Sequence, residues 1–329
     1  MPLRMTRDRA LLRLLRAGVF LGMCTGCVAV GKSLGEAHRE VVVEMVAAPP
    51  TAAIELMVSN GQQDVGGQYP TTLRVVSENA KGFSGSPGSA GKCSGVLIAK
   101  NLVLTAAHCM CLQPIRASVN KAINRTDCAT RARVKQYVRK IVRSKDDDIE
   151  SIISKYPSFS GSAFLPEEFR VDLDEEGQIT STRADVAVIR LDSQIDIKLD
   201  YEPADREFRE DDRITVVGFG STSVNGKEAS DSRNFGKNTV TGIRVMEYEP
   251  RPPPNKKHRE GHFHRAYEAN TEVGDSGGPC FREEGARRWL MGIMLQRMNA
   301  TGVKTSCLDL FHSKPLLERL IQQAKDPTD

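Results

Sequence analysis

The chain has 329 residues, of which 40% are hydrophobic and 27% charged, a composition that fits a soluble globular protein and argues against a disordered chain or one with many membrane spans. The formal net charge is +4, and residues 1–27 carry all of it, with five arginines against one aspartate. The rest of the chain is near neutral, so composition gives no reason to expect nucleic-acid binding.

Residues 1–27 have the layout of a secretory signal peptide. Their basic region leads into a short apolar run, AGVFLGMCTGCVAV, that ends at Val30 and is shorter than the roughly 20 residues that a spanning helix needs. Thr25-Gly26-Cys27 resembles the end of a bacterial lipobox, which makes Cys27 a candidate for lipidation. Because Cys24 stands where that signal usually has an aliphatic residue, ordinary cleavage nearby, for instance after Ala29, is the alternative. We expect a bacterial exported protein, secreted or anchored to the cell envelope.

Residues 26–33, GCVAVGKS, fit the phosphate-loop pattern GxxxxGK[ST]. Such a loop needs a buried strand before it and a helix after it inside an α/β core. Here an arginine-rich segment with the look of a targeting sequence precedes it. A nucleotide binder is an alternative only if these residues survive processing.

Residues 28–57 are expected to form a pro-segment or tether. Ser33-Leu34-Gly35-Glu36 fits a capping box, which predicts a short helix that runs to about Ala48. Pro49-Pro50 would end that helix.

Three later segments carry candidate catalytic side chains. In residues 93–109, CSGVLIAKNLVLTAAHC, two apolar runs flank a Lys-Asn turn, which predicts a hairpin with His108 just beyond a buried strand. In ADVAVIRL, Asp185 opens a short apolar strand. In GDSGGP, Ser276 lies among glycines that permit a sharp turn and leave room for a substrate. Taken alone, His108 and Asp185 would more often be structural residues.

Together the three segments resemble the chymotrypsin-like (trypsin-type) serine protease family, whose signatures are TAAHC, a D-[IV]-A-[LV] strand and GDSGGP, in this order. Weaker resemblance covers most of residues 58–325. It implies an all-β fold of two packed six-stranded antiparallel β-barrels with a C-terminal α-helix, in a protease domain over residues 58–326. The spacing of apolar residues between Leu316 and Ile321 also predicts a helix from Lys314 to Ala324.

The resemblance implies a serine endopeptidase that hydrolyses peptide bonds through an acyl-enzyme. A neutral serine is a weak nucleophile, so His108 would act as the base for Ser276 and later as the acid for the leaving amine. Asp185 would orient the imidazole and stabilise its charged form. The backbone N–H groups of Gly274 and Ser276 would form the oxyanion hole. No cofactor is expected. The alternative is a non-catalytic binding protein on a protease scaffold.

His108 and Asp185 are 77 residues apart, against about 45 in the family template. An insertion therefore lies between them, and the polar, irregular residues 140–183 are its expected place. We expect a solvated surface excursion; a loop that frames the cleft or binds a partner is the alternative.

Activation in this family frees an aliphatic N-terminus, whose amine pairs with the acid before the serine. That acid is Asp275 here, and Val58 is the best candidate for the new terminus. Because Met57 precedes it, the activating protease is not expected to be trypsin-like.

The substrate pocket departs from that of trypsin. The residue at its base, six before the serine, is Asn270, which has no full charge and does not support cleavage after Lys or Arg. Arg297, in the stretch Leu295-Gln296-Arg297 that normally pairs with substrate backbone, would narrow the pocket or attract an acidic substrate. We expect protein or peptide substrates and a monomer.

Six cysteines remain after Cys24 and Cys27, and six allow 15 pairings. The resemblance implies a Cys93–Cys109 bridge. It fixes only this pair; for the other four cysteines we expect Cys111–Cys128 and Cys280–Cys307.

No metal site is expected. Residues 172–177, DLDEEG, begin like a calcium-binding loop, but Arg183 stands where a bidentate glutamate belongs. His258, His262 and His264 lack a cysteine or acid that would complete a zinc site.

Overall fold

Strands predominate in the computed structural model of the chain. It describes residues 38–45, 61–78, 92–111, 122–143, 150–173, 179–220, 223–224, 227–228, 232–248, 274–299 and 302–326. The compact unit that carries the fold spans Ala37–Asp329. Within the described ranges, no helix is both long and apolar enough to span a membrane.

Six antiparallel strands form the first barrel, in the closed order β10-β13-β5-β4-β3-β7. They are β3 (Thr72–Glu78), β4 (Lys92–Ala99), β5 (Leu102–Thr105), β7 (Arg131–Lys135), β10 (Ser158–Phe164) and β13 (Ala187–Leu191). Fully buried aliphatic side chains such as Leu73, Val96 and Leu104 form its core. Strands β4 and β5 pair around Lys100-Asn101, which confirms the predicted hairpin.

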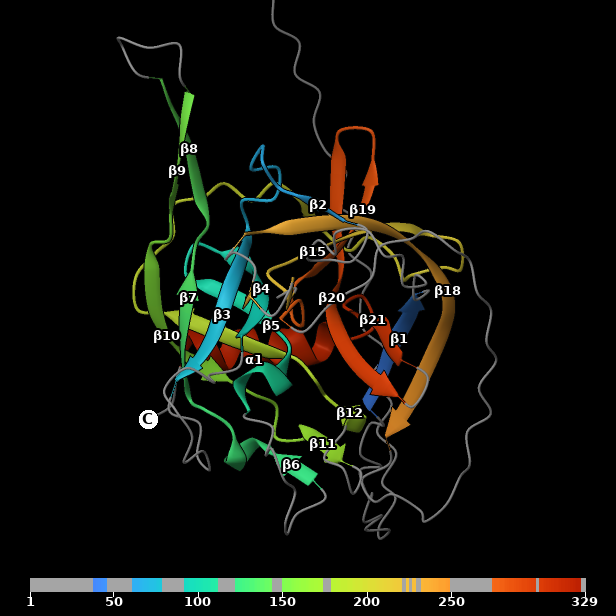
Figure 1. Cartoon of the computed structure of the whole chain (residues 1–329). Coiled ribbons are helices and arrows are strands. Elements are labelled where there is room, and N and C mark those ends of the chain that lie inside the picture. Colours follow the sequence, from blue (N-terminus) through green and yellow to red (C-terminus); the bar gives the residue numbers. More distant parts are fainter. Residues whose placement is uncertain are drawn as a thin grey trace, which may run out of the picture. The chain divides into compact units, whose positions relative to one another are not determined.

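A second ring of six strands lies beside the first barrel (Figure 1). Its members are β1 (His38–Met45), β15 (Arg213–Gly218), β18 (Asn234–Tyr248), β19 (Pro279–Glu284), β20 (Arg287–Asn299) and β21 (Gly302–Asp309). They follow the order β1-β21-β20-β19-β15-β18, and the pairing of β1 with β18 closes the ring. The short strands β2 (Gln62–Gln63) and β14 (Glu202–Pro203) add to β18 and β20. The prediction of two six-stranded barrels is therefore confirmed.

The helix predicted from Ser33 to about Ala48 is wrong. Residues 38–45 form β1, which pairs with β18 from His38↔Tyr248 to Met45↔Val240 and with β21 on its other edge. In Figure 1 the blue β1 accordingly lies between the orange β18 and the red β21. A capping box is only a local signal. Three successive valines favour a strand, and here the edges of β18 and β21 are both open to pair with it.

The prediction that residues 140–183 are irregular is also wrong, because this stretch contains the barrel strand β10. Two excursions flank it. The hairpin of β8 (Val138–Arg143) and β9 (Glu150–Lys155) extends away from the barrel (Figure 1). The pair β11 (Arg170–Leu173) and β12 (Ile179–Arg183) joins β6 (Ala122–Asn124) in a small sheet. The charged residues between these short strands made the alternation of polar and apolar residues within the strands hard to recognise in the sequence.

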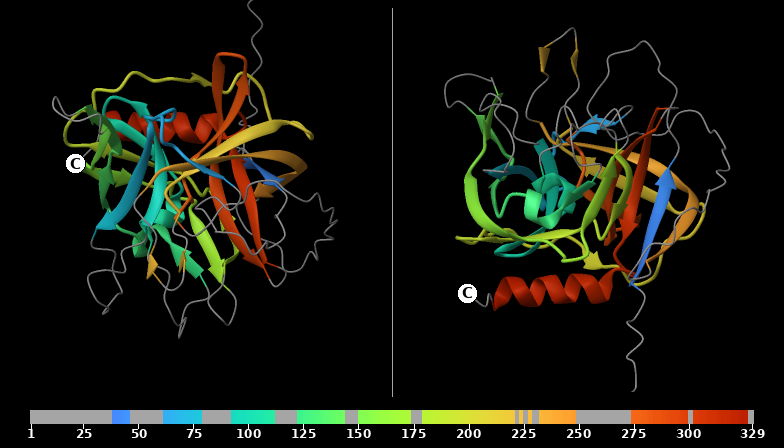
Figure 2. Two further views of the ribbon diagram at one scale, coloured as in Figure 1. Left: turned by 45° about the horizontal axis from the view of Figure 1, so that its top comes forward. Right: turned by 90° about the horizontal axis from the view of Figure 1, so that it is seen from below.

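The C-terminal helix α1 (Lys314–Lys325) confirms the predicted helix. Its buried residues are Leu320 and Ala324, and it packs against β13 and β10 (Figure 2). Because α1 follows β21 of the second ring but packs on strands of the first barrel, it ties the two barrels together.

Candidate active site

His108 lies on a short 3₁₀ turn, Ala107–Met110, directly after β5. The disulfide Cys93–Cys109 joins this turn to the start of β4. The structure also joins the other two expected pairs, Cys111–Cys128 and Cys280–Cys307. The residue directly after His108 is thus cross-linked to the first barrel, which helps to hold the imidazole in a defined place.

Asp185 precedes β13 and is fully buried. Its Oδ1 accepts a hydrogen bond from the backbone N–H of His108, and its Oδ2 lies 2.8 Å from His108 Nδ1, the same distance as the first bond. Both oxygens of the Asp185 carboxylate therefore interact with His108. When Nδ1 carries the proton that it donates to Asp185, Nε2 is left as the free proton acceptor of the ring.

A left-handed residue precedes this aspartate. Ala184 has φ 49°, a conformation that costs a non-glycine residue of order 1 kcal/mol or more. The carbonyl of Ala184 accepts a hydrogen bond of 2.8 Å from the N–H of Val186. This tight turn directs the Asp185 side chain toward His108 rather than along the strand.

The environment of His108 raises its pKa above the ordinary value. Burial is the largest influence and lowers the pKa. The negative charge of Asp185 and its hydrogen bond to the ring raise the pKa and together outweigh burial. Asp185 thus stabilises the imidazolium form of His108, which is the form that results when Nε2 accepts a proton.

Ser276 lies at a tight loop between Gly274 and Gly278, on the side of the second barrel. Gly277 has φ +80°, and a Cβ there would stand 2.2 Å from Thr105 Oγ1 and 2.5 Å from the Ser94 carbonyl oxygen. Glycine is therefore required both by the backbone angle and by the close approach of the first barrel. The loop that carries Ser276 therefore packs directly against β4 and β5.

The amides expected to form the oxyanion hole are available. Neither Gly274 nor Ser276 donates its N–H to another described residue. The Ser276 carbonyl, by contrast, accepts the N–H of Ser94 at 2.8 Å. The Ser276 carbonyl thus ties the loop to β4, while the N–H groups of Gly274 and Ser276 have no acceptor among the described residues.

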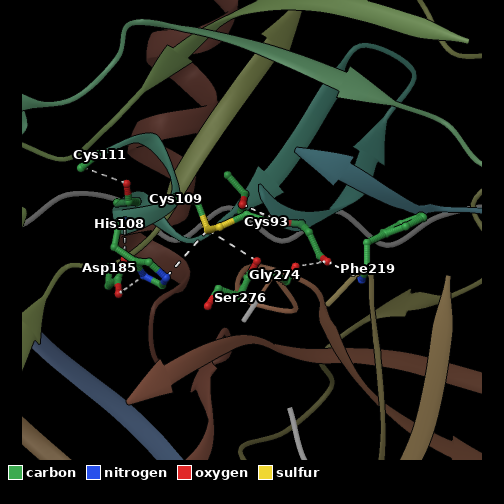
Figure 3. The surroundings of a disulfide bond; sticks show 11 residues. Cys93, His108, Cys109, Cys111, Asp185, Phe219, Gly274 and Ser276 are labelled. Atoms are coloured by element: carbon green, nitrogen blue, oxygen red, sulfur yellow. Dashed lines mark hydrogen bonds and ion pairs between the residues drawn. A yellow bond between two sulfur atoms is a disulfide. The ribbon is translucent and has the colours of Figure 1, made fainter. Parts of the chain in front are cut away.

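His108 and Ser276 flank the Cys93–Cys109 disulfide (Figure 3). The Cys109 sulfur lies 3.8 Å from His108 Nε2 and 3.5 Å from the Ser276 carbonyl oxygen. The structure contains no hydrogen bond between Ser276 Oγ and His108 Nε2; such bonds are often long in sites without substrate and tighten when substrate binds. The sulfurs of Cys93 and Cys109 lie near a histidine nitrogen, but as a disulfide they offer no thiolate to a metal.

Asp275 is fully buried, and its Oδ1 accepts the N–H of Gly220 at 2.7 Å. A Cβ at Gly218 would lie 2.1 Å from the same oxygen, so the carboxylate packs tightly against the end of β15. Val58, the predicted partner of Asp275, lies outside the described residues.

The remaining predicted site residues are Asn270, Cys27 and Arg297. Asn270 and Cys27 lie outside the described residues. Arg297 lies in β20, opposite Lys304 of β21.

Sequence reasoning missed two residues that hold this region. Ser94 bonds to the loop that carries Ser276. Arg233 forms a buried ion pair with Asp64. Neither residue carries a local signal for these bonds, because Ser94 reaches Gly274 and Arg233 reaches Asp64 across more than 160 positions of the chain.

A comparison with known protein families identifies a domain in the chain. Residues 93–293 match the family model described as a trypsin-like peptidase domain. This range covers more than half of the chain and contains His108, Asp185 and Ser276. No curated protein shows significant similarity to the chain.

Proposed function

The chain belongs to the trypsin-like peptidase family, and on this basis we propose that it is an exported serine endopeptidase in which Ser276 forms the acyl-enzyme. The carbonyl carbon of a peptide bond is attacked by Ser276 Oγ while His108 Nε2 takes the serine proton. His108 then gives this proton to the leaving amine. A water molecule then attacks the acyl-enzyme in the same way, with His108 as the base, and the carboxylic acid product is released from Ser276.

The observation that carries the proposal is the double hydrogen bond of Asp185 to His108, at 2.8 Å from each oxygen. It selects the tautomer in which Nε2 accepts a proton. It also stabilises the imidazolium that forms during attack, in line with the raised pKa of His108.

The N–H groups of Gly274 and Ser276 would receive the negative oxygen of the tetrahedral intermediate. Their lack of an acceptor among the described residues supports this role. Loss of one donor from such a hole typically costs about 10²–10³ in rate.

Substrate would bind as an extended strand along β20. Strand β19 pairs with β20 only as far as Ile293, while β21 pairs with the other edge as far as Asn299. Beyond Ile293 the first edge has no described strand partner, which suits addition of a peptide strand. Asn270 at the pocket base would leave cleavage after Lys or Arg unsupported, and Arg297 would favour acidic substrates.

Export is part of the proposal. Residues 1–27 would be the signal peptide, and Cys27 the site of lipidation if the chain is anchored. The three disulfides are compatible with an oxidising compartment. Cleavage before Val58 would provide the amine that pairs with Asp275.

Labelling with a fluorophosphonate, read by intact mass, tests the proposal. The chain should be used in two forms, uncleaved and cleaved before Val58 with residues 38–45 retained, because β1 is part of the second barrel. A single adduct that is lost in Ser276→Ala is expected in at least one form. No adduct on either folded form would overturn the proposal and favour a non-catalytic scaffold.

A further inference from the structure

Ser94 of β4 is fully buried, and each of its polar groups is engaged. Its N–H donates to the Ser276 carbonyl at 2.8 Å, and its own carbonyl accepts from Thr105 Oγ1 at 2.7 Å. Its Oγ donates to the Gly274 carbonyl at 2.8 Å and accepts the N–H of Phe219 at 2.9 Å. A hydroxyl has one proton to donate, and here that proton is used on the loop that carries Ser276.

These bonds connect the two barrels. Ser94 belongs to the first barrel, whereas Phe219 follows β15 of the second. Figure 3 shows Phe219 and Gly274 close together, beside the disulfide that flanks Ser276. One buried hydroxyl therefore joins a first-barrel strand to two separate segments of the second barrel.

Gly274 is a residue whose backbone conformation must be fixed by its neighbours. It has φ 108°, and without a Cβ its peptide planes rotate at little steric cost. Ser94 holds the carbonyl of Gly274 with its side chain and the carbonyl of Ser276 with its backbone. The segment between these two anchors has little freedom to turn either N–H away from the reacting oxygen.

We propose that Ser94 is a positioning residue, which aligns the Gly274 and Ser276 amides for the oxyanion. This inference rests on the proposed peptidase function. Donors that are already aligned need no reorganisation as charge develops. The Ser94 hydroxyl thus lowers the barrier of acylation without touching the substrate.

The test compares Ser94→Ala with Thr215→Val in the full chain. Thr215 donates a partly buried hydrogen bond of 2.7 Å to Glu283 in the second barrel, so its valine variant also loses a hydroxyl bond, but away from the loop. The readout is the rate constant of fluorophosphonate labelling and its pH dependence, together with the melting temperature.

Ser94→Ala is expected to label about 10- to 100-fold more slowly than wild type, because a small misplacement in an active site has effects of this size. The pH at which its rate is half-maximal should stay unchanged, since His108 and Asp185 are untouched. Thr215→Val should label at the wild-type rate. Ser94→Gly carries the same prediction as Ser94→Ala if the alanine variant does not fold.

The proposal is overturned if the Ser94 variants label within threefold of wild type, or if Thr215→Val is slowed to the same degree at a similar loss of melting temperature. The second result would make the Ser94 bond merely structural. Failure of wild type to label at all would instead overturn the peptidase function, so the two failures are distinguishable.

Discussion

Asp64 and Arg233 form an ion pair in which both side chains are almost wholly buried, with Arg233 Nη2 2.7 Å from Asp64 Oδ2. The same carboxylate accepts the backbone N–H groups of Gln68 and Tyr69. Burial is the largest influence on Arg233 and lowers its pKa, while the charge of Asp64 opposes that effect. The pair holds the segment before β3 against β18.

Asp64→Asn should therefore destabilise the protein strongly. It leaves a buried guanidinium without its counter-charge, which typically costs about 3–5 kcal/mol. The measurement is the free energy of unfolding in urea. The matched control is Asp192→Asn, which breaks the exposed pair with Arg131 and should change stability little. Equal effects of the two substitutions would contradict the role given to the buried pair.

The labelling rate of Ser276 should rise with pH through the pKa of His108. The base must be neutral to accept a proton, and the pKa of His108 is raised, so the half-maximal rate should lie above pH 6.5, the ordinary value for histidine. Asp185→Asn removes the negative charge that raises the pKa of His108. The midpoint should therefore move to lower pH, and the maximal rate should fall by about 10⁴-fold, as in the family template. An unchanged midpoint would argue against this pairing.

The same raised pKa affects stability. The folded state binds the His108 proton more tightly than the unfolded state does. This contribution is fully present below the unfolded pKa, and it is lost as pH rises through the folded pKa. Unfolding in urea at a series of pH values should show a loss of stability across that window, and Asp185→Asn should not show it.

Two disulfides offer a matched comparison. Cys93–Cys109 and Cys111–Cys128 span sequence separations of 16 and 17 residues, so replacing either pair by alanine should cost a similar amount, about 3 kcal/mol. Only the first has a sulfur close to both His108 Nε2 and the Ser276 carbonyl oxygen. Its loss should also slow labelling at least about tenfold, whereas the second variant should label nearly normally at a temperature where both are folded. Equal labelling of the two variants would show that the first disulfide has no role in placing His108.

Strand β1 should stay with the second barrel after the chain is cut behind it. Its backbone pairs with both β18 and β21, so cleavage at a protease site engineered between Met45 and Val58 should give two fragments that co-elute under native conditions. They should separate only in denaturant. Release of the N-terminal fragment under native conditions would mean that β1 is dispensable for the closed ring.

The sequence by itself determined the parts of this protein that depend on short-range order. The hairpin of β4 and β5 and the helix α1 follow from periodic apolar residues and a turn, and the three candidate catalytic side chains lie in short motifs. Tertiary structure decided the rest. Residues 38–45 became a strand because β18 and β21 each offered an edge, and a capping box cannot report edges that lie about 200 residues or more away.

The bonds of Ser94 and Asp64 were hidden from sequence reasoning for the same reason. The Oγ of Ser94 meets the Gly274 carbonyl across 180 positions, and Asp64 meets Arg233 across 169. A buried polar group must find a partner wherever the fold brings one, and which partner that is depends on how the two barrels pack.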